Sequence, residues 1–511
     1  MKASDPPATV DGAASAPSIA IIGAGLGGIA TAVRLKRAGI DSFTIFEQSA
    51  GPGGTWWDNT YPGAECDIPI AFYSYSFMPH DWKGTHASQA EIQEYIQLVI
   101  DRFGLQPHIR YNTRVNEAIW NEASHFYTLG TSAGVLRFDI VVSALGLLNV
   151  PRYPTWPGLD TFKGIKFHTA RWEHQHDLAG KRVAVVGNGS SAAQVVPGIA
   201  PVVGNLKMFA REPAYVMPKQ ERVLTPQERK RNRSSLWRRW ERFKLFRGVE
   251  RSVSLRDPGS KAQRERRAAY EQYVAKIFAD RPDLRAVVVP DYPYACKRVI
   301  QSSDLYPALK RDNVELVSRA VVSVTQDGVV DSAGEEHKID VLVMATGFQP
   351  WHFLSTLKLV GRAGRSIRGV WGEEPEAYLG IQVPGFPNFF MMYGPNTNYF
   401  CITFLLEQQA TYIAKSILRM IKKKDTAVEV RPLFMNVYND KLKKSLSGKV
   451  LEANCSNYYH TATGRNVVTY PWWGSLYWTL SRLPWLSTVT YRPLSNQPKH
   501  VDLGRTMNVS S

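Results

Sequence analysis

Two glycine-rich turns in this chain have the residue types and spacing that bind phosphate groups. The first, Gly23-Ala-Gly25-Leu-Gly-Gly28, stands between an apolar β-branched run and a helical run. Gly23 and Gly25 permit a tight turn and close approach of a pyrophosphate, Gly28 lets the helix pack on its strand, and the helix N-terminus binds phosphate. Glu47 ends the next strand, where a carboxylate meets a ribose hydroxyl. This unit predicts FAD or NAD.

The second turn, Gly187-Asn-Gly189-Ser190-Ser191-Ala192, begins a unit of the same kind but differs at its acid position. Its next strand, 205–210, has Lys207 inside it and Arg211 after it, with no acid at its end. A cation there accommodates the extra phosphate of NADP, so NADPH is favoured over NADH. The alternative is that Arg211 is a surface arginine beside Glu212.

Two nucleotide units in one chain imply hydride transfer from a nicotinamide to a flavin. Flavoprotein reductases, oxidases and monooxygenases all fit to this point. The four cysteines are far apart and include no C-x-x-C pair, which argues against a disulfide framework and against the disulfide reductases. No second metal-ligand residue is convincingly spaced with His168, so no metal site is predicted.

The 511 residues are 44% apolar and 21% charged, which is enough for two or three domains. We expect an α/β protein with two Rossmann-like dinucleotide-binding domains. Strands 139–146 and 340–347 end in small residues and glycine, where the backbone approaches a cofactor or crosses between domains; two ordinary core strands are the alternative. The expected divisions are a flexible tail over 1–18, an FAD domain over 19–155 and 384–511, an NADP domain over 156–218 and 291–383, and a helical insertion over 219–290.

The formal charge of +17 is concentrated between Lys219 and Arg285, within the helical insertion. Charge runs usually form solvated helical faces, so we favour this interpretation over nucleic-acid binding. The segment 471–494 is aromatic but too interrupted to span a bilayer, and we favour its packing in the core over membrane docking. The N-terminal tail has no apolar run typical of a signal peptide, and a cytoplasmic location is expected.

The segment Phe162-Lys-Gly164-Ile-Lys-Phe-His168-Thr-Ala-Arg-Trp172 fits the pattern F-x-G-x-x-x-H-x-x-x-W. This is the fingerprint of Baeyer–Villiger monooxygenases, and the chain resembles that family. Related flavin-containing N- and S-oxygenases carry Tyr or Phe where this chain has Trp172. Glu173 is a mild departure, since the family usually has Pro or Asp there. The resemblance implies that His168 and Trp172 belong to a hinge between domains.

A second family pattern is Gly53-Gly-Thr55-Trp56, then Tyr61-Pro-Gly63, then Asp67. The resemblance extends from about Ile19 to Gly464 and implies that Thr55, Trp56 and Asp67 lie at the flavin. The family's C-terminal Ser-Trp-Tyr run is replaced by Asn457-Tyr458-Tyr459, so its usual contact to NADP and substrate would pass to Tyr458.

The family's essential arginine lies in a Tyr-Pro-x-x-x-Lys-Arg stretch, which matches Tyr292 to Arg298. The resemblance implies that Arg298 is catalytic, that Asp67 orients it and that Lys297 reaches the NADP phosphate. A permanent guanidinium charge stabilises both an anionic peroxide and the oxyanion of a tetrahedral adduct. The alternative is a structural Lys-Arg pair on a loop.

The resemblance therefore implies that NADPH reduces FAD, that O2 forms a flavin peroxide, and that this attacks a small-molecule ketone to give an ester or lactone. One rival interpretation is an amine or sulfide oxygenase. The other is a flavin-binding interaction protein without turnover.

Overall fold

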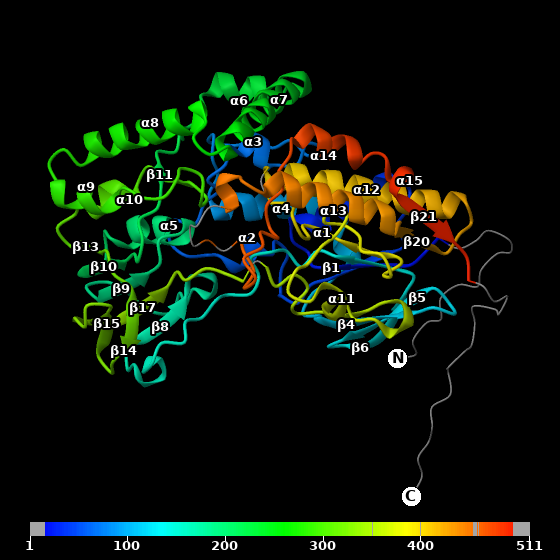
Figure 1. The fold of residues 1–511 in the computed structure, drawn as a ribbon, viewed down its shortest axis with the longest axis horizontal. Coiled ribbons are helices and arrows are strands. Elements are labelled where there is room, and N and C mark those ends of the chain that lie inside the picture. The colour runs from blue at the N-terminus through cyan, green and yellow to red at the C-terminus, as the bar shows by residue number, and fades with distance from the viewer. Residues whose placement is uncertain (1–15, 350, 399, 453–456, 458, 494–511) are drawn as a thin grey trace, which may run out of the picture.

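The computed structural model describes residues 16–349, 351–398, 400–452, 457 and 459–493 (Figure 1). Its first unit is built on a parallel five-stranded sheet in the order β19-β7-β1-β2-β3. The apolar β-branched composition of the central strands matches their complete burial, because helices cover both faces of such a sheet. The strands are β1 (Ile19–Ile22), β2 (Phe43–Phe46), β3 (Ile109–Arg110), β7 (Ile140–Ser143) and β19 (Phe389–Met391).

The second unit repeats this arrangement in the order β13-β10-β9-β17-β8, again with every pair parallel. In both units the glycine turn follows the central strand and leads into a helix, as the sequence predicts. The expected fold class, with two Rossmann-like units, is confirmed. The strands are β8 (Ile165–His168), β9 (Arg182–Val186), β10 (Asn205–Phe209), β13 (Val314–Val317) and β17 (Val341–Met344).

Amphipathic helices pack on these sheets. In the first unit, the helix after the glycine turn packs along a long C-terminal helix, so the two ends of the chain build one core. In the second, the helix after the turn packs against α10. The helices are α1 (Leu26–Arg37), α4 (Gln89–Arg102) and α12 (Ile402–Lys422) in the first unit, with α5 (Ser190–Ile199) and α10 (Leu305–Leu309) in the second.

Each unit also has a second sheet beside its parallel one, which is antiparallel except for one parallel strand pair in the first unit. The first is β18-β4-β5-β6, made of β4 (Val115–Asn121), β5 (Phe126–Thr131), β6 (Gly134–Phe138) and β18 (Lys358–Val360), and the nearby helix is α11 (Ile367–Trp371). The second is β14 (Val321–Val324), β15 (Gly328–Asp331) and β16 (Glu336–Lys338).

The placement of β18 differs from the domain division expected from the sequence, which assigns 291–383 to the NADP domain. β18 pairs with β4, and Phe353, Leu357 and Trp371 join the core that contains β1. The physical reason is that the apolar residues after Gly347 are buried on the first unit's sheet. We therefore propose that the chain returns to the first unit near residue 348.

The basic segment from 219 to 290 folds as helices without a strand and contacts both units. Arg242 donates hydrogen bonds to the carbonyls of Ala71 and Ser74 in the first unit. Tyr270 and Val274 enter the core of the second. The helices are α6 (Pro226–Asn232), α7 (Ser235–Arg251), the 3-10 turn η4 (Ser252–Arg256), α8 (Lys261–Ile277) and α9 (Pro282–Val288). The short strands β11 (Val216–Met217) and β12 (Ile300–Gln301) pair at its base.

The C-terminal aromatic segment completes the core only in part, whereas the sequence favours packing of this segment in the core. Tyr477 is fully buried, as is Tyr470 just before the segment, whereas Trp473, Trp478 and Trp485 are exposed. Within the described ranges, no helix is long and apolar enough to cross a membrane. The elements are α13 (Pro432–Leu446), α14 (Gly474–Leu480), α15 (Pro484–Ser487), β20 (Ala427–Val430) and β21 (Thr488–Tyr491). Cys296 is disulfide-bonded, which the cysteine spacing did not suggest.

Candidate active site

The first glycine turn leaves no room for side chains at two of its three predicted positions. Gly23 has φ +107°, and a Cβ there would lie 2.6 Å from the carbonyl oxygen of Ala144. A Cβ on Gly28 would lie 1.9 Å from the carbonyl oxygen of Gly23. Gly25 precedes α1 and lines a cavity, and its nearest neighbour would be in ordinary contact. The turn therefore brings bare backbone to the cavity, as a bound pyrophosphate requires.

Glu47 is buried at the end of β2 and is fixed by the backbone. Its two carboxylate oxygens accept hydrogen bonds of 2.8 Å from the N–H groups of Ala24 and Ser49. An ionised carboxylate has about four acceptor positions, so Glu47 can still accept from a ribose hydroxyl. Glu47 also lines the cavity.

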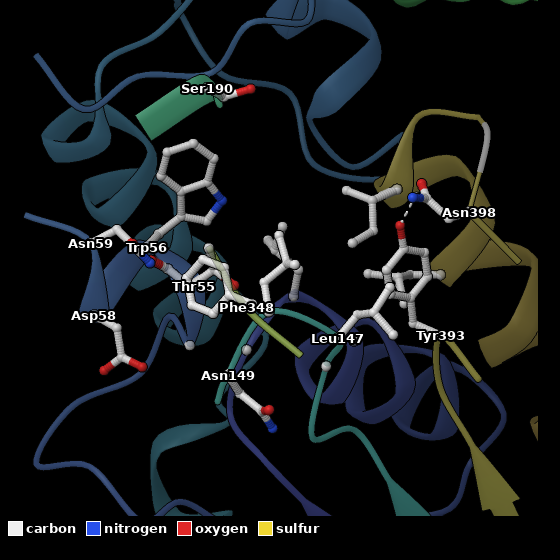
Figure 2. Close-up of a pocket in the computed structure, with 18 of the residues that line it drawn as sticks. Thr55, Trp56, Asp58, Asn59, Leu147, Asn149, Ser190, Phe348, Tyr393 and Asn398 are labelled. Atoms are coloured by element: carbon white, nitrogen blue, oxygen red, sulfur yellow. Dashed lines mark hydrogen bonds between the residues drawn. The ribbon is translucent and has the colours of Figure 1, made fainter. Parts of the chain in front are cut away.

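The segment Gly53 to Trp56 closes over the first turn. Gly53 and Gly54 both have positive φ, and the Gly53 N–H donates to the Ala24 carbonyl at 3.0 Å. The short helix α2 (Thr55–Asp58) follows, and the Trp56 indole donates to the Tyr73 hydroxyl at 2.9 Å. Figure 2 shows Thr55 and Trp56 at the cavity, near Phe348. This segment and the first turn together form a cradle that fits FAD.

The second glycine turn has the same backbone constraint as the first. Gly187 has φ +133°, and a Cβ there would lie 2.2 Å from the carbonyl oxygen of Ala345. Gly189 faces open space, and Ser190 and Ser191 begin α5 and line the cavity. Ala192, the sixth residue of the turn, is buried. The N-terminus of α5 thus points its free N–H groups toward the cavity, where they can bind phosphate.

Two cations meet at Glu212, just beyond β10. Arg211 is largely exposed, with its Nε 3.8 Å from the Glu212 carboxylate. Lys297 forms an ion pair with the same carboxylate, and its Nζ lies 4.5 Å from the centre of the Tyr292 ring. Lys207 instead pairs with Glu315 on β13. Arg211 lies beside Glu212 on the surface, as the alternative interpretation has it. Lys297 lies next to the same glutamate, so two cations are close together at this position.

Arg298 and Asp67 form an ion pair across the two units. The Arg298 Nη2 lies 2.7 Å and 2.5 Å from the two carboxylate oxygens of Asp67. Both contacts come from one nitrogen, so Asp67 fixes one edge of the guanidinium. Both residues line the cavity. Asp67 follows the cradle segment, and Arg298 follows the helical insertion, so the pair forms only when both units are in place.

The cavity has a volume of about 730 Å³ and is lined by both units and by the helical insertion. Several lining residues could not be found from sequence patterns. Leu255 and Arg256 come from η4, and the Arg256 Nη1 donates to the Tyr470 carbonyl at 2.7 Å. Figure 2 shows Tyr393 and Asn398 on the side opposite Trp56, joined by a hydrogen bond of 2.8 Å. No motif marked these residues. The tyrosine expected from the family pattern, Tyr458, lies outside the described residues.

The fingerprint segment lies away from the cavity, at the crossing between the units. His168 ends β8; its Nδ1 accepts from the Ala170 N–H at 3.1 Å, so its Nε2 donates to the Gly347 carbonyl at 3.1 Å. Burial lowers the pKa of His168 to about 4, which keeps the ring neutral. Gly347 also accepts from the Arg152 N–H at 2.8 Å. His168 therefore ties β8 to both crossing segments.

The other fingerprint residues pack around this strand. A Cβ on Gly164 would lie 2.4 Å from the Asp340 carbonyl oxygen and 2.5 Å from the Phe162 ring, so only glycine fits. Phe162 is buried, and Trp172 packs edge-on against Phe167 at 4.8 Å between centroids. Neither residue lines the cavity.

The Tyr61-Pro-Gly63 pattern is a contact between the two units. The Tyr61 hydroxyl donates to Gln194 on α5 at 2.9 Å, and a Cβ on Gly63 would lie 2.5 Å from the Gln194 carbonyl oxygen. Nearby, the ammonium of Lys219, which is almost fully buried, pairs with Glu65 and Glu221.

Among the described residues, one group of side chains, Asp331, Glu335 and His337, is spaced like metal ligands. It lies on β15, on β16 and in the turn between them, outside the cavity. Arg319 pairs with both carboxylates at 2.9 and 3.0 Å, so each already has a cationic partner. This group therefore resembles a structural ion-pair network.

Comparisons with known proteins agree with this geometry. Residues 20–231 match the model of the pyridine nucleotide-disulphide oxidoreductase family. The chain is 37% identical to a Baeyer-Villiger monooxygenase of Streptomyces coelicolor over 462 residues, covering 89% of this chain and 88% of that protein. It is 35% identical to a Baeyer-Villiger monooxygenase of Pseudomonas aeruginosa over 464 residues, covering 89% and 87%.

Solved structures give the same result. A steroid monooxygenase bound to NADP is 29% identical with a TM-score of 0.84, covering 94% of this chain and 100% of that one. The NADP+ complex of cyclohexanone monooxygenase from Rhodococcus sp. Phi1 is 28% identical with a TM-score of 0.85, covering 94% and 99%.

Proposed function

Because this chain belongs to the Baeyer–Villiger monooxygenases, we propose that Arg298 and Asp67 are its catalytic pair and that the cavity holds a small-molecule ketone. The chain is an NADPH-dependent flavoprotein monooxygenase, and the predicted enzyme class and cofactors, FAD and NADPH, are confirmed. The observation that carries the residue assignment is the Arg298–Asp67 ion pair on the cavity wall.

FAD fits the cradle of the first unit. Gly23, Gly25 and Gly28 would let its pyrophosphate approach the backbone, and Glu47 would bind the ribose. Thr55 and Trp56 would border the flavin end. When bound and reduced by NADPH, FAD activates O2 for insertion of one oxygen atom into the carbonyl substrate.

The guanidinium of Arg298 would stabilise the negative charge that develops in this reaction. Insertion of oxygen beside a carbonyl places negative charge on the attacking oxygen and then on the former carbonyl oxygen. Arg298 stays cationic at all working pH values, and it can donate hydrogen bonds to such oxygens. Asp67 holds the guanidinium edge in place, so little reorganisation is needed when the charge develops. The half-buried position of the pair increases its electrostatic effect relative to open water.

The second unit would hold NADPH. Gly187, Gly189, Ser190 and Ser191 form the phosphate turn at the N-terminus of α5. The 2′-phosphate would take the place of the Glu212 carboxylate between Arg211 and Lys297, because a phosphate carries more charge than a carboxylate. Glu212 then keeps the two cations positioned until NADPH binds.

The decisive experiment compares Arg298→Ala with Arg182→Ala. Arg182 forms an ion pair with Asp340 outside the cavity, so it is a matched control for loss of a paired arginine. We expect Arg298→Ala to bind FAD and accept hydride from NADPH while forming ester or lactone about 10²- to 10³-fold more slowly. Product is measured by chromatography with a panel of ketones. Asp67→Asn should give a smaller loss, because Arg298 stays but loses its fixed edge.

Equal product formation by Arg298→Ala and the wild type would contradict the catalytic assignment. An unchanged Arg182→Ala variant would show that loss of an arginine ion pair is not itself the cause.

A further inference from the structure

The outer face of α7 carries apolar side chains that a solvated helix normally turns inward. Leu236, Trp240 and Phe243 are 75%, 52% and 51% exposed. Their spacing is that of one helical face, and the Trp240 and Phe243 rings stack with centroids 5.9 Å apart. The opposite face, with Phe246 and Val249, packs against the first unit. The apolar outer face of α7 therefore lies against solvent.

Helices α14 and α15 extend this face. Their exposed apolar residues are between 37% and 50% accessible, and Trp473 just before α14 is 60% accessible. The Ser475 N–H at the start of α14 donates to Glu250 near the end of α7 at 2.9 Å, which joins the helices. Figure 1 shows α7, α14 and α15 along one edge of the molecule. We call this the tryptophan surface, and it consists of Leu236, Trp240, Phe243, Trp473, Leu476, Trp478, Trp485 and Leu486.

Cations are interspersed with these side chains. α7 contains six basic and two acidic residues, and both acids pair with a base of the same helix. One of the six bases, Arg242, faces the first unit, and the others are available to this surface. The Arg482 guanidinium lies 3.6 Å above the Trp478 ring, and the Lys415 ammonium lies 5.6 Å from that of Trp485. The surface is therefore both apolar and positively charged. The chain as a whole carries a formal charge of +17.

We propose that the tryptophan surface docks on an anionic lipid bilayer. Tryptophan is the side chain most suited to the membrane interface, and interspersed arginine and lysine bind anionic headgroups. A second copy of the chain is a poorer partner, because a two-fold contact would bring the cations of α7 against their own copies. Nucleic acid would pair with the cations but would leave the leucines exposed to water.

The docked surface is connected to the cavity wall through α7. α7 continues directly into η4, and Leu255 and Arg256 of η4 line the cavity wall. A lipophilic ketone dissolved in the bilayer would thus be delivered beside the site of oxidation. This step, unlike the docking itself, rests on the proposed function.

Docking is tested by flotation of the FAD-loaded full-length enzyme with vesicles. One set is phosphatidylcholine alone, and the other is phosphatidylcholine mixed with phosphatidylglycerol. We expect the enzyme to float with the anionic vesicles and to be released by salt. The variant Trp240→Ser/Trp478→Ser removes two apolar contacts, and Arg239→Glu/Lys244→Glu reverses two charges. Each should weaken binding by about tenfold or more. Val135→Ser/Val322→Ser is the control, because both valines are exposed on antiparallel sheets away from this surface.

NADPH oxidation in the same samples shows that each variant is folded. Failure of the active wild-type enzyme to bind anionic vesicles would overturn the proposal. So would a dimer in sedimentation that the tryptophan variant disrupts while vesicle binding stays absent, since a second copy would then cover the surface. Equal weakening by the valine control would also contradict it. Ester formation is scored separately, so failure of the catalytic assignment leaves this result unaffected.

Discussion

The two parallel sheets hold their glycine turns in the same backbone arrangement but surround these turns with different side chains. Both place a central strand next to one that is followed by an alanine, and the carbonyl of that alanine lies against the first glycine of the turn. In one unit these are Ala144 and Gly23; in the other they are Ala345 and Gly187. Asp139 and Asp340, just before these neighbouring strands β7 and β17, accept hydrogen bonds of 2.8 Å from the backbone N–H of Ser18 and Arg182. The shared frame therefore places a nucleotide, and the differences select which one.

Three differences occur at equivalent register positions. Gly28 corresponds to Ala192 in the helix after the turn. Glu47 corresponds to Ala210, with Arg211 following, because Phe46 and Phe209 occupy the same register against the central strand. At the outer strand, Met391 pairs with Ser143 where His168 pairs with Met344. Tight helix packing and an acid characterise the first unit; a cation and a neutral histidine characterise the second.

The largest expected effect is on cofactor binding, when a methyl group is introduced into each glycine turn in a separate variant. Gly28→Ala should release FAD, and Gly187→Ala should keep FAD but lose reduction by NADPH, because each methyl group meets a backbone carbonyl. Strain of about 3 kcal/mol corresponds to affinity losses of about a hundredfold. Flavin absorbance per protein and anaerobic bleaching by NADPH separate the two outcomes. Gly248→Ala, which faces open space on α7, is the control. Identical defects in both variants would break the comparison.

Arg211→Ala should raise the KM for NADPH by about tenfold and leave that for NADH unchanged, because only NADPH carries the extra phosphate. Steady-state oxidation of both coenzymes measures this difference. A parallel rise for both would mean that Arg211 supports the fold of the second unit instead of reading the phosphate.

The histidine difference predicts an acid-dependent loss of stability. Burial lowers the His168 pKa from 6.5 to about 4. The unfolded chain binds this proton more readily, so the contribution of His168 is complete above pH 6.5 and is lost as the pH falls toward 4. The thermal midpoint should fall over this range, and His168→Gln should flatten the dependence. An unchanged slope in His168→Gln would assign the acid sensitivity to other groups.

The smallest effect is expected for Ala192→Gly, which makes the second turn like the first. Glycine within a helix costs about 1 kcal/mol, and little else changes because the backbone geometry is already shared. The thermal midpoint should fall slightly while NADPH oxidation persists. Loss of NADPH binding would show that the methyl group positions the turn.

Local patterns predicted the frame of this molecule well. The glycine turns, their strands and Glu47 could be predicted because glycine and β-branched residues have strong local backbone preferences. Arg298 and Asp67 came from family motifs, and the structure brings them together across 231 positions of sequence. No local rule relates residues so far apart.

The remaining features depended on distant packing. β18 joins the first unit because apolar residues near it are buried there. A strand of only three residues has too little sequence pattern to predict which sheet it joins. The spacing of Leu236, Trp240 and Phe243 places them on one helical face, and the structure turns this face outward. Periodicity identifies a shared face of a helix but not what that face meets.

The crossing between the units has a mechanical consequence. Residues near Arg152 and Phe348 run antiparallel, joined by Arg152 N–H to Gly347 at 2.8 Å and Thr346 Oγ1 to the Arg152 carbonyl at 2.5 Å. A single connecting strand would permit swivelling in any direction. A hydrogen-bonded ribbon of two bends easily across its plane but resists torsion. The second unit should therefore approach and withdraw along one arc, and a single proteolytic cut in the ribbon should lower its resistance to torsion while the helical insertion keeps the two units attached.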